Sequence, residues 1–276
     1  MAKNPRMRLD QLLVDRGLAA TRSLARALIM AGEVEVGSVT VDKAGAAVPV
    51  SADVRLRERP RFVSRAGAKL AHALDSFAVD VAGRRTLDVG ASTGGFVDCL
   101  LQRGVAEVVA LDVGYGQLDQ RLRVDPRVHV MERVNARHLT ADQLPYEPDL
   151  LTADVSFISL EKVLPAVVAT LAPAFDALVL VKPQFEAGRE RVGKGGIVRD
   201  AAVHRDVLAR FVDFIRRTTV LEVLGVVDSG LPGTSGNREF VVWFGRGGAK
   251  GLSLATLESA IDDLTLVSDG GMVPDD

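Results

Sequence analysis

The stretch Arg85-Thr86-Leu87-Asp88-Val89-Gly90-Ala91-Ser92-Thr93-Gly94-Gly95 decides the fold of this chain. Its first part, Thr86 to Val89, is a short run of strand-forming residues that stops at Gly90. A helix is predicted to begin near Gly95, because one helical face then carries the apolar residues Phe96, Val97, Leu100 and Leu101. A strand that leads through a glycine turn into a helix is typical of the first unit of a nucleotide-binding α/β sheet.

The spacing of these glycines indicates a ligand other than a dinucleotide. The pattern Gly90-x-x-x-Gly94-Gly95 does not match G-x-G-x-x-G, while glycine still lets the backbone turn sharply against a ligand. Asp88, at the strand end, is placed to meet an amine or a hydroxyl. This favours S-adenosylmethionine, which carries a charged amino acid and no pyrophosphate; a tight turn without a ligand is the alternative. The predicted cofactor contacts here are Asp88, Gly90, Ala91, Ser92, Thr93, Gly94, Gly95 and Phe96.

Length and charge place limits on the class of protein. A chain of 276 residues is long enough for two domains or one large one. The formal net charge of −2 gives no overall case for nucleic acid. The first 60 residues, however, hold ten basic and seven acidic side chains, which indicates a basic partner-binding module at the front.

The same composition indicates a cytoplasmic protein. Cys99 is the only cysteine, so an internal disulfide is impossible and a reducing compartment fits. No apolar signal core follows the first positive charges, and no apolar run approaches the roughly 18 residues of a membrane span. Four scattered histidines and one cysteine predict no metal site.

Residues 1–59 are predicted to form a small α+β domain, followed by a linker over 60–64. Helices are expected over 9–15 and after Thr21, the second ending before Gly32, and a hairpin is expected around Gly37-Ser38. Arg22 and Arg26 lie four residues apart and therefore share one helical face. That face either binds RNA or is a solvated basic surface.

From residue 65 to 246 the chain alternates between strands and helices. Seven apolar segments predict a Rossmann-like, mostly parallel sheet covered on both faces, with the last two strands antiparallel at one edge. These segments are 86–89, 108–112, 128–130, 150–153, 177–181, 221–227 and 239–244. The longest helix is expected over 199–217. Residues 247–276 form a polar extension in which one helix, 254–264, is expected.

Polar residues follow several of these strands. Ligands of such sheets bind beyond the carboxyl ends of the strands, so strand-end polar residues are candidate contacts. Asp112 is spaced to bind ribose hydroxyls, with Val113 beside it, and the amide of Asn135 is placed to read the adenine edge. Asp154 and Lys182 end the next two strands. A helix cap or a turn residue is the alternative for each single acid.

Lys182 is the most informative of these residues. It ends a strand expected to be buried on both faces, where a lysine is rare unless it is paired. Asp154 is the natural partner, and a purely structural ion pair is one interpretation. The other is a general base that removes a proton from a ribose hydroxyl. A desolvated lysine near a second cation such as Lys69 would lose its proton more readily, and Asp154 and Glu239 would orient the two lysines.

The segment Gly188-x-x-x-x-Gly193-Lys194 nearly matches a P-loop. Gly195 stands where Ser or Thr should bind magnesium, and the run from Pro183 to Gly196 is expected to be a loop, so a nucleoside triphosphatase is rejected. Arg189 and Lys194 would instead contact RNA phosphates, or belong to a solvated loop.

Two parts of the chain resemble known families. Residues from Arg8 to Val36 resemble the alpha-L RNA-binding module of a small-subunit ribosomal protein. The ordered set Lys69, Asp154, Lys182 and Glu239 resembles the Lys-Asp-Lys-Glu tetrad of ribose 2′-O-methyltransferases of the FtsJ/RrmJ type. The tetrad residues are thereby implied to be catalytic. We assign RNA contact to Arg8, Arg22, Arg26, Arg65, Arg189 and Lys194.

Together the two parts resemble the TlyA family over residues 8–244. This resemblance implies S-adenosylmethionine as cofactor, ribosomal subunits as partners, methylation of cytidine in small- and large-subunit rRNA, and a link to capreomycin susceptibility. Two other functions stay open: a non-catalytic RNA-binding or ribosome-assembly protein, and a hemolysin, as one label of the family suggests. The sequence predicts no spanning segment, so any lysis is expected to be indirect.

Overall fold

The computed structural model describes residues 5–57, 60–217, 221–248 and 250–266, and it divides into two compact units after Arg61. The first unit contains two helices and two small antiparallel sheets, ordered β1-β4 and β3-β2-β5. Its elements are β1 (Arg6–Arg8), α1 (Leu9–Asp15), α2 (Arg22–Met30), β2 (Val34–Val36), β3 (Val39–Thr40), β4 (Ala47–Pro49) and β5 (Val54–Leu56).

Local signals in the sequence explain the first unit. The side chain of Thr21 accepts a hydrogen bond from the amide of Leu24 and so caps α2, and Gly32 follows the helix with a φ of 70°. Val36 pairs with Val39 across the Gly37-Ser38 turn. Leu9, Leu12 and Leu13 of α1 pack on Ala25 and Ile29 of α2 in a separate small core. The expected helices and hairpin are present.

The second unit is a seven-stranded sheet ordered β11-β12-β10-β9-β6-β7-β8. Strands β6 to β10 are parallel, whereas β12 pairs antiparallel with both β10 and β11. All seven predicted strands are present, and the predicted antiparallel edge is confirmed. The strands are β6 (Arg85–Val89), β7 (Glu107–Asp112), β8 (Val128–Glu132), β9 (Leu150–Ala153), β10 (Phe175–Val181), β11 (Glu222–Asp228) and β12 (Phe240–Arg246).

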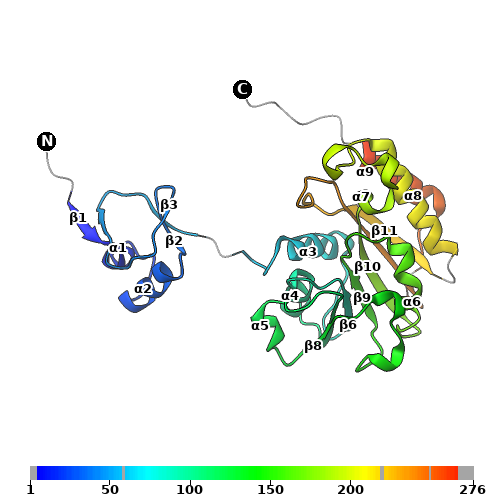
Figure 1. Cartoon of the computed structure of the whole chain (residues 1–276), viewed down its shortest axis with the longest axis horizontal. Helices are drawn as coiled ribbons and strands as arrows, with labels where there is room; N and C mark the ends of the chain where they lie inside the picture. The colour runs from blue at the N-terminus through cyan, green and yellow to red at the C-terminus, as the bar shows by residue number, and fades with distance from the viewer. Residues whose placement is uncertain (1–4, 58–59, 218–220, 249, 267–276) are drawn as a thin grey trace. The chain divides into compact units, whose positions relative to one another are not determined.

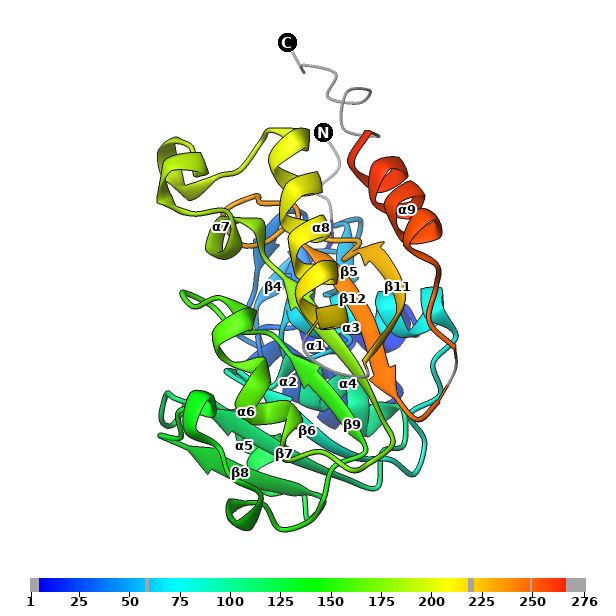
Figure 2. The same cartoon turned by 90° about the vertical axis from the view of Figure 1, so that its right-hand side faces the viewer.

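Helices cover both faces of this sheet (Figures 1 and 2). Leu70 and Leu74 of α3 and Leu100 of α4 pack on one face, and Leu208 and Phe211 of α8 pack on the other. The helices are α3 (Arg65–Phe77), α4 (Gly95–Gln102), α5 (Gln120–Arg123), α6 (Leu164–Val168), α7 (Pro183–Glu186), α8 (Ala201–Arg217) and α9 (Leu254–Leu266). The expectation of an uninterrupted loop after Pro183 is wrong, because α7 and two 3-10 turns, Arg189–Arg191 and Lys194–Gly196, lie there.

Two aromatic residues contribute to one core of the second unit, Phe62 as a buried residue and Trp243 as a partly buried one. Phe62 is buried in the core formed by α3 and α4, next to Gly67, so it packs within this unit. Trp243 of β12 donates from its indole nitrogen to Oδ1 of Asp176 at 3.0 Å, and its ring lies 5.5 Å from that of Phe77.

Among the described residues no helix is long and apolar enough to cross a membrane.

Candidate active site

The carboxyl ends of the parallel strands meet at one edge of the sheet. In the register, Val89 pairs with both Leu111 and Ala153, and Ala153 pairs with Val179. The chain after β9 turns toward the glycine loop, where the amide of Asp154 donates to the carbonyl of Val89 at 2.9 Å. This edge therefore brings Asp112, Asp154 and Lys182 toward the glycine loop.

Two adjoining cavities lie at this edge. The larger, about 490 Å³, has mostly apolar walls with polar groups at Ser92, Asp112, Gln117, Asn135 and Asp154. The smaller, about 140 Å³, reaches Lys182. They share Gly90, Ser92, Asp154 and Ser156. The predicted cofactor residues that line one or both are Gly90, Ala91, Ser92, Thr93, Gly95, Phe96, Asp112, Val113, Asn135 and Asp154.

The glycine loop packs so closely against the rest of the unit that two of its positions have no room for a side chain. Gly90 has a φ of +85°, and a Cβ there would lie 2.6 Å from the carbonyl oxygen of Asp154. A Cβ on Gly95 would lie 2.2 Å from Oγ of Ser64. Both positions therefore require glycine, because neighbouring protein atoms occupy the space that a side chain would need.

Asp112 joins the two loops that bound the larger cavity. Its Oδ2 accepts from the amide of Ser92 at 2.8 Å, and its Oδ1 accepts from the amide of Gly114 at 2.6 Å. Asn135 is more exposed, and its Oδ1 caps a 3-10 turn through the amide of Arg137 at 3.1 Å. An apolar slot with a fixed carboxylate and a nearby amide suits the adenosine part of S-adenosylmethionine.

Two members of the predicted cofactor set, Asp88 and Gly94, line neither cavity. Strand β6 continues to Val89, so Asp88 lies inside the sheet, where Oγ1 of Thr152 donates to its Oδ1 at 2.6 Å. Its Oδ2 has no hydrogen-bond partner. Burial, with a smaller contribution from the nearby Asp154 and Asp112, raises the pKa of Asp88 to about 7. Gly94 faces Leu118 and Leu122 instead of the cavities.

The four tetrad residues form two lysine–carboxylate pairs. Nζ of Lys182 lies 2.5 Å from Oδ1 of Asp154, and Nζ of Lys69 lies 2.5 Å from Oε2 of Glu239. All but Asp154 are buried, with 9% of Lys182, 7% of Lys69 and 3% of Glu239 exposed. Such burial of a charged residue is rare unless it is paired, so each lysine has its own carboxylate.

Three further residues of this site were not assigned from the sequence. Lys182 donates to Oγ of Ser156 at 2.8 Å. Gln184 donates from Nε2 to Oε1 of Glu239 at 3.1 Å and so links α7 to the second pair. The third is Gln117, which lines the larger cavity and accepts from Oγ of Ser92 at 3.3 Å. Ser156 lies two residues after Asp154, and Gln184 lies two residues after Lys182. This proximity in the sequence could have indicated both residues.

Phe157 is an exposed aromatic residue beside this site. It has a φ of 63°, a conformation that non-glycine residues rarely adopt, and 90% of the residue is exposed. Its ring lies 5.0 Å from that of Phe185, over which Nζ of Lys182 lies at 5.9 Å. Phe157 also lines the larger cavity. Tyr115, on the loop after β7, is exposed, and the guanidinium of Arg133 lies over its ring at 4.1 Å.

Two of the basic residues of the first unit, Arg8 and Arg22, contact one buried carboxylate. Oδ2 of Asp10 lies 3.0 Å from Nη2 of Arg8 and 3.1 Å from Nη2 of Arg22. These contacts, the bond from Arg8 foremost, lower the pKa of Asp10 to about 2. Arg22 and Arg26 line the same open groove on α2. Arg22 therefore has a structural contact in addition to its exposed face.

The basic residues of the second unit predicted to bind RNA, Arg65, Arg189 and Lys194, are all exposed. The loop carrying Lys194 is fixed to the strand edge by the buried Asn237. Its Oδ1 accepts from the amide of Val198 and its Nδ2 donates to the carbonyl of Gly196, both at 2.9 Å. In this loop, Lys194 follows a helical turn and no strand, so it lacks the strand–loop–helix context of a P-loop.

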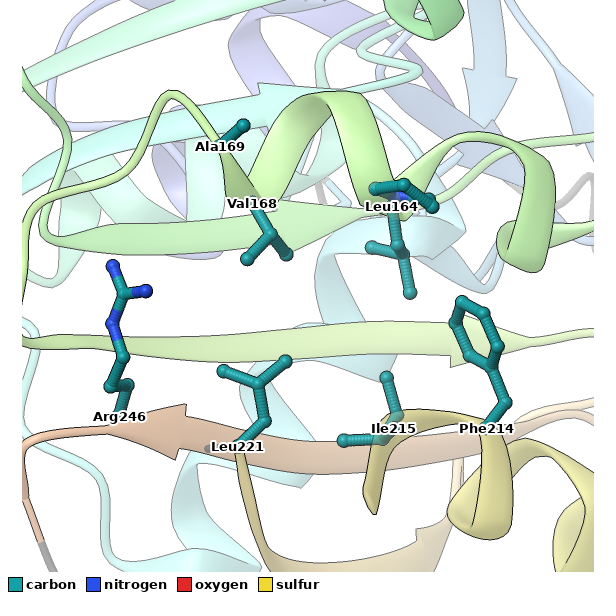
Figure 3. A pocket seen from close by; sticks show the side chains of 8 residues that line it. Leu164, Val168, Ala169, Phe214, Ile215, Leu221 and Arg246 are labelled. Carbon is teal, nitrogen blue, oxygen red and sulfur yellow. The ribbon is translucent and has the colours of Figure 1, made fainter. Parts of the chain in front are cut away.

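A third cavity, about 270 Å³, is lined by residues of α6 and of the last turns of α8, together with Leu221 and Arg246 (Figure 3). Its lining is apolar except for Arg246, whose guanidinium donates to the carbonyls of Pro173 and Ala172. It offers no acid or base, and so is not a candidate active site. Within the described ranges, no group of three or more His, Cys, Asp and Glu side chains is placed to hold a metal ion.

Comparison with known proteins gives two family matches. Residues 7–54 match the S4 domain, and residues 62–246 match the FtsJ-like methyltransferase family. The 16S/23S rRNA (cytidine-2′-O)-methyltransferase TlyA of Mycobacterium tuberculosis is 48% identical over 261 residues, which cover 93% of this chain and 96% of that protein.

Two further relatives extend the comparison. Hemolysin A of Brachyspira hyodysenteriae is 38% identical over 86% of this chain and 99% of its own. A solved Streptococcus thermophilus structure is 36% identical with a TM-score of 0.69, covering 95% of this chain and 96% of its own.

Fold and site thus define a methyltransferase of the Rossmann-like class that carries an RNA-binding domain. The chain belongs to the TlyA family, in which an S4 domain precedes an FtsJ-like methyltransferase domain, and the resemblance inferred from the sequence is confirmed.

Proposed function

We propose that this protein transfers a methyl group from S-adenosylmethionine to the ribose 2′-hydroxyl of cytidine in small- and large-subunit ribosomal RNA. The observation that carries the proposal is the contact between the buried Lys182 and Asp154 beside the glycine-loop cavity, together with a second buried lysine–carboxylate pair, Lys69–Glu239, in the same unit. Two relatives named as rRNA cytidine-2′-O-methyltransferases, from Mycobacterium tuberculosis and Campylobacter jejuni, supply the substrate class.

The residues that line the two cavities are the proposed cofactor site. Asp112 and Asn135 would hold the adenosine end, and the Gly90–Gly95 loop the amino-acid end. When bound, S-adenosylmethionine supplies an electrophilic methyl group. Asp88 has an indirect role. The hydrogen bond that it accepts from Thr152 joins the neighbouring strands β6 and β9, and β6 leads into the glycine loop.

Lys182 is the proposed general base. Nζ would accept the proton that leaves the 2′ oxygen; the oxygen–methyl bond would form as the methyl–sulfur bond of the bound donor breaks, and the thioether would leave. Asp154, 2.5 Å away, then stabilises the resulting ammonium, and Ser156 fixes the direction of Nζ. The Lys69–Glu239 pair lies in the same predicted tetrad, and Gln184 orients it.

Phe157 is the proposed platform for the base of the target nucleotide. The exposed ring of Phe157 lies near Lys182, the proposed general base, and gives an unstacked nucleobase a surface to stack on. This stacking lowers the free-energy cost of holding the nucleotide outside its helix. The basic residues Arg8, Arg22, Arg26, Arg65, Arg189 and Lys194 would contact phosphates of the surrounding RNA.

The test uses radiolabelled S-adenosylmethionine with separated small and large ribosomal subunits, followed by mapping of 2′-O-methyl sites. We expect label in rRNA from the natural protein and none from Lys182→Ala. A protein that binds S-adenosylmethionine and subunits but transfers no label would instead be an RNA-binding or assembly factor. If methylation is confirmed, loss of the protein is expected to reduce capreomycin susceptibility.

A purified protein that released haemoglobin from red cells would support the hemolysin alternative. One relative of this chain carries the name Hemolysin A. The described helices offer no membrane-spanning segment for that activity.

A further inference from the structure

The helix α9 lies beyond the residues that match the methyltransferase family, yet it belongs to the same core. The family match ends at residue 246, whereas α9 runs from Leu254 to Leu266. Its Leu257 and Ile261 are buried in the core that α8 shares with the sheet. Figure 2 shows α8 and α9 side by side, and Arg205 and Asp262 join them through an ion pair of 2.5 Å.

Arg238 connects this helix to the sheet. Its Nε and Nη2 donate to Oδ2 of Asp228, at the end of β11, over 3.1 and 2.9 Å. The same Nη2 donates to the carbonyl of Leu264 at 3.0 Å. Carbonyls in the last turn of a helix lack partners within the helix and carry a partial negative charge, so a guanidinium is a favourable partner there. Arg238 thus ties α9 to the end of β11.

The residue after Arg238 is Glu239, the carboxylate of the second tetrad pair. Its side chain accepts from Lys69 and Gln184, and its carbonyl accepts from the amide of Ser229 at 2.9 Å. Its backbone position is therefore fixed from the β11 side by Ser229 and, through the adjoining peptide, by Arg238. Displacement of catalytic groups by about 1 Å can lower rates by about a hundredfold, so this anchoring matters for the reaction.

We infer that Arg238 is a positioning residue for the Glu239–Lys69 pair, and that its contact with the carbonyl of Leu264 makes α9 part of the same anchor. The inference rests on the proposed methyl transfer for its kinetic consequence. Its structural consequence, a fixed Ser229–Glu239 contact, is independent of that function.

The test compares Arg238→Met, Arg238→Lys and Arg205→Met in the full chain. Arg238→Met removes the contacts to Asp228 and Leu264 but keeps the length of the side chain. Arg205→Met removes an ion pair between α8 and α9 that does not touch Glu239. Thermal unfolding of each variant checks that the fold is kept at the assay temperature.

We expect Arg238→Met to lower kcat about tenfold, while KM for RNA and Kd for S-adenosylmethionine stay within twofold. Arg238→Lys should recover part of kcat, and Arg205→Met should match the natural protein. Hydrogen exchange at the amide of Ser229 should become faster in Arg238→Met alone.

An unchanged exchange rate at Ser229 overturns the inference whether or not the protein is active. A normal kcat in Arg238→Met overturns it as well, as does an equal loss of kcat in Arg205→Met. If the natural protein transfers no methyl group, the proposed function fails, and the exchange measurement alone decides the anchoring role.

Discussion

Nζ of Lys182 lies 2.5 Å from Oδ1 of Asp154, directly beside the cavity that the glycine loop bounds. The contact joins the residues that follow two neighbouring parallel strands, β9 and β10. Because both are backbone-fixed at the sheet edge, the lysine is held in place before any substrate arrives, which is the requirement for an oriented base.

Replacing the proposed base should abolish transfer without loss of binding. Lys182→Ala is expected to reduce kcat at least a hundredfold, within the range of about 10²–10⁴ that a positioned base contributes. Calorimetry with S-adenosylmethionine and filter binding of rRNA should give unchanged affinities. Lys162→Ala, an exposed lysine on the same unit, is the control. Normal turnover by Lys182→Ala would remove it from the mechanism.

The glycine loop should not tolerate even one methyl group. Gly90→Ala places a Cβ 2.6 Å from the carbonyl of Asp154, which must move and disturb the cavity that both residues line. We expect S-adenosylmethionine affinity to fall more than tenfold by calorimetry. Gly83→Ala is the matched control, because Gly83 also has a positive φ, +72°, but has nothing within 4 Å. Equal affinities in the two variants would argue against a ligand at Gly90.

Asp88 should make the stability of the fold depend on pH. Its pKa is about 7 in the folded protein, against about 3.9 for a solvated aspartate. The folded state thus keeps a proton that the unfolded state releases. The contribution of Asp88 to the free energy of unfolding is therefore fully present below about pH 4 and is lost as the pH rises through about 7.

Asp88→Asn removes this charge and should raise Tm at pH 8 by a few degrees relative to the natural protein, but not at pH 4. Differential scanning calorimetry at both pH values measures the effect, with the exposed Asp142→Asn as control. The same Tm difference at both pH values would contradict a raised pKa.

Phe157 should act on the RNA and not on the cofactor. Phe157→Ala is expected to lower kcat/KM for rRNA about tenfold, consistent with about 1–3 kcal/mol for stacking of one base. Phe157→Tyr keeps the ring and should be near normal. Val124→Ala, which also removes exposed apolar surface, should change nothing. Equal activity of Phe157→Ala and Phe157→Tyr would rule out stacking.

The groove on α2 should contribute phosphate contacts. Arg26→Ala is expected to weaken rRNA binding and to reduce the slope of log K against log salt by about 0.7–0.9, the value for one lost phosphate contact. Arg55, which pairs with Asp53 in the same unit, provides the control Arg55→Ala. Arg22→Ala should also destabilise the first unit, because Asp10 loses one of its two arginines. An unchanged slope for Arg26→Ala would show that Arg26 makes no phosphate contact and that this face of α2 is a solvated surface.

Most of the fold could be predicted from the sequence, because strands, turns and helix ends are signalled by neighbouring residues in the chain. The apolar runs and their turns are sufficient to find seven strands, and Thr21 and Gly32 delimit α2. The short helix α7 was missed because the whole run from Pro183 to Gly196 was predicted to be a loop. At the first position of a helix, however, proline is favourable, since its missing amide would have no partner there.

The sequence predicted the site residues whose position depends only on the end of their own strand. The strand-end rule found Asp112, Asp154 and Lys182, which line the cavities. The same rule also assigned Asp88, which lies inside β6, accepts a hydrogen bond from Thr152 of the neighbouring strand and lines neither cavity. The exposure of Phe157 depends on a left-handed backbone that no nearby glycine indicates.

The position of Trp243 on β12 has a practical consequence. It is the only tryptophan of the chain, and it lies in the second unit beside Phe77 and Asp176. Intrinsic fluorescence excited at the indole band therefore monitors unfolding of the methyltransferase unit, while circular dichroism records both units. In denaturant titrations of the intact protein, a difference between the two signals would measure how independently the S4 domain unfolds.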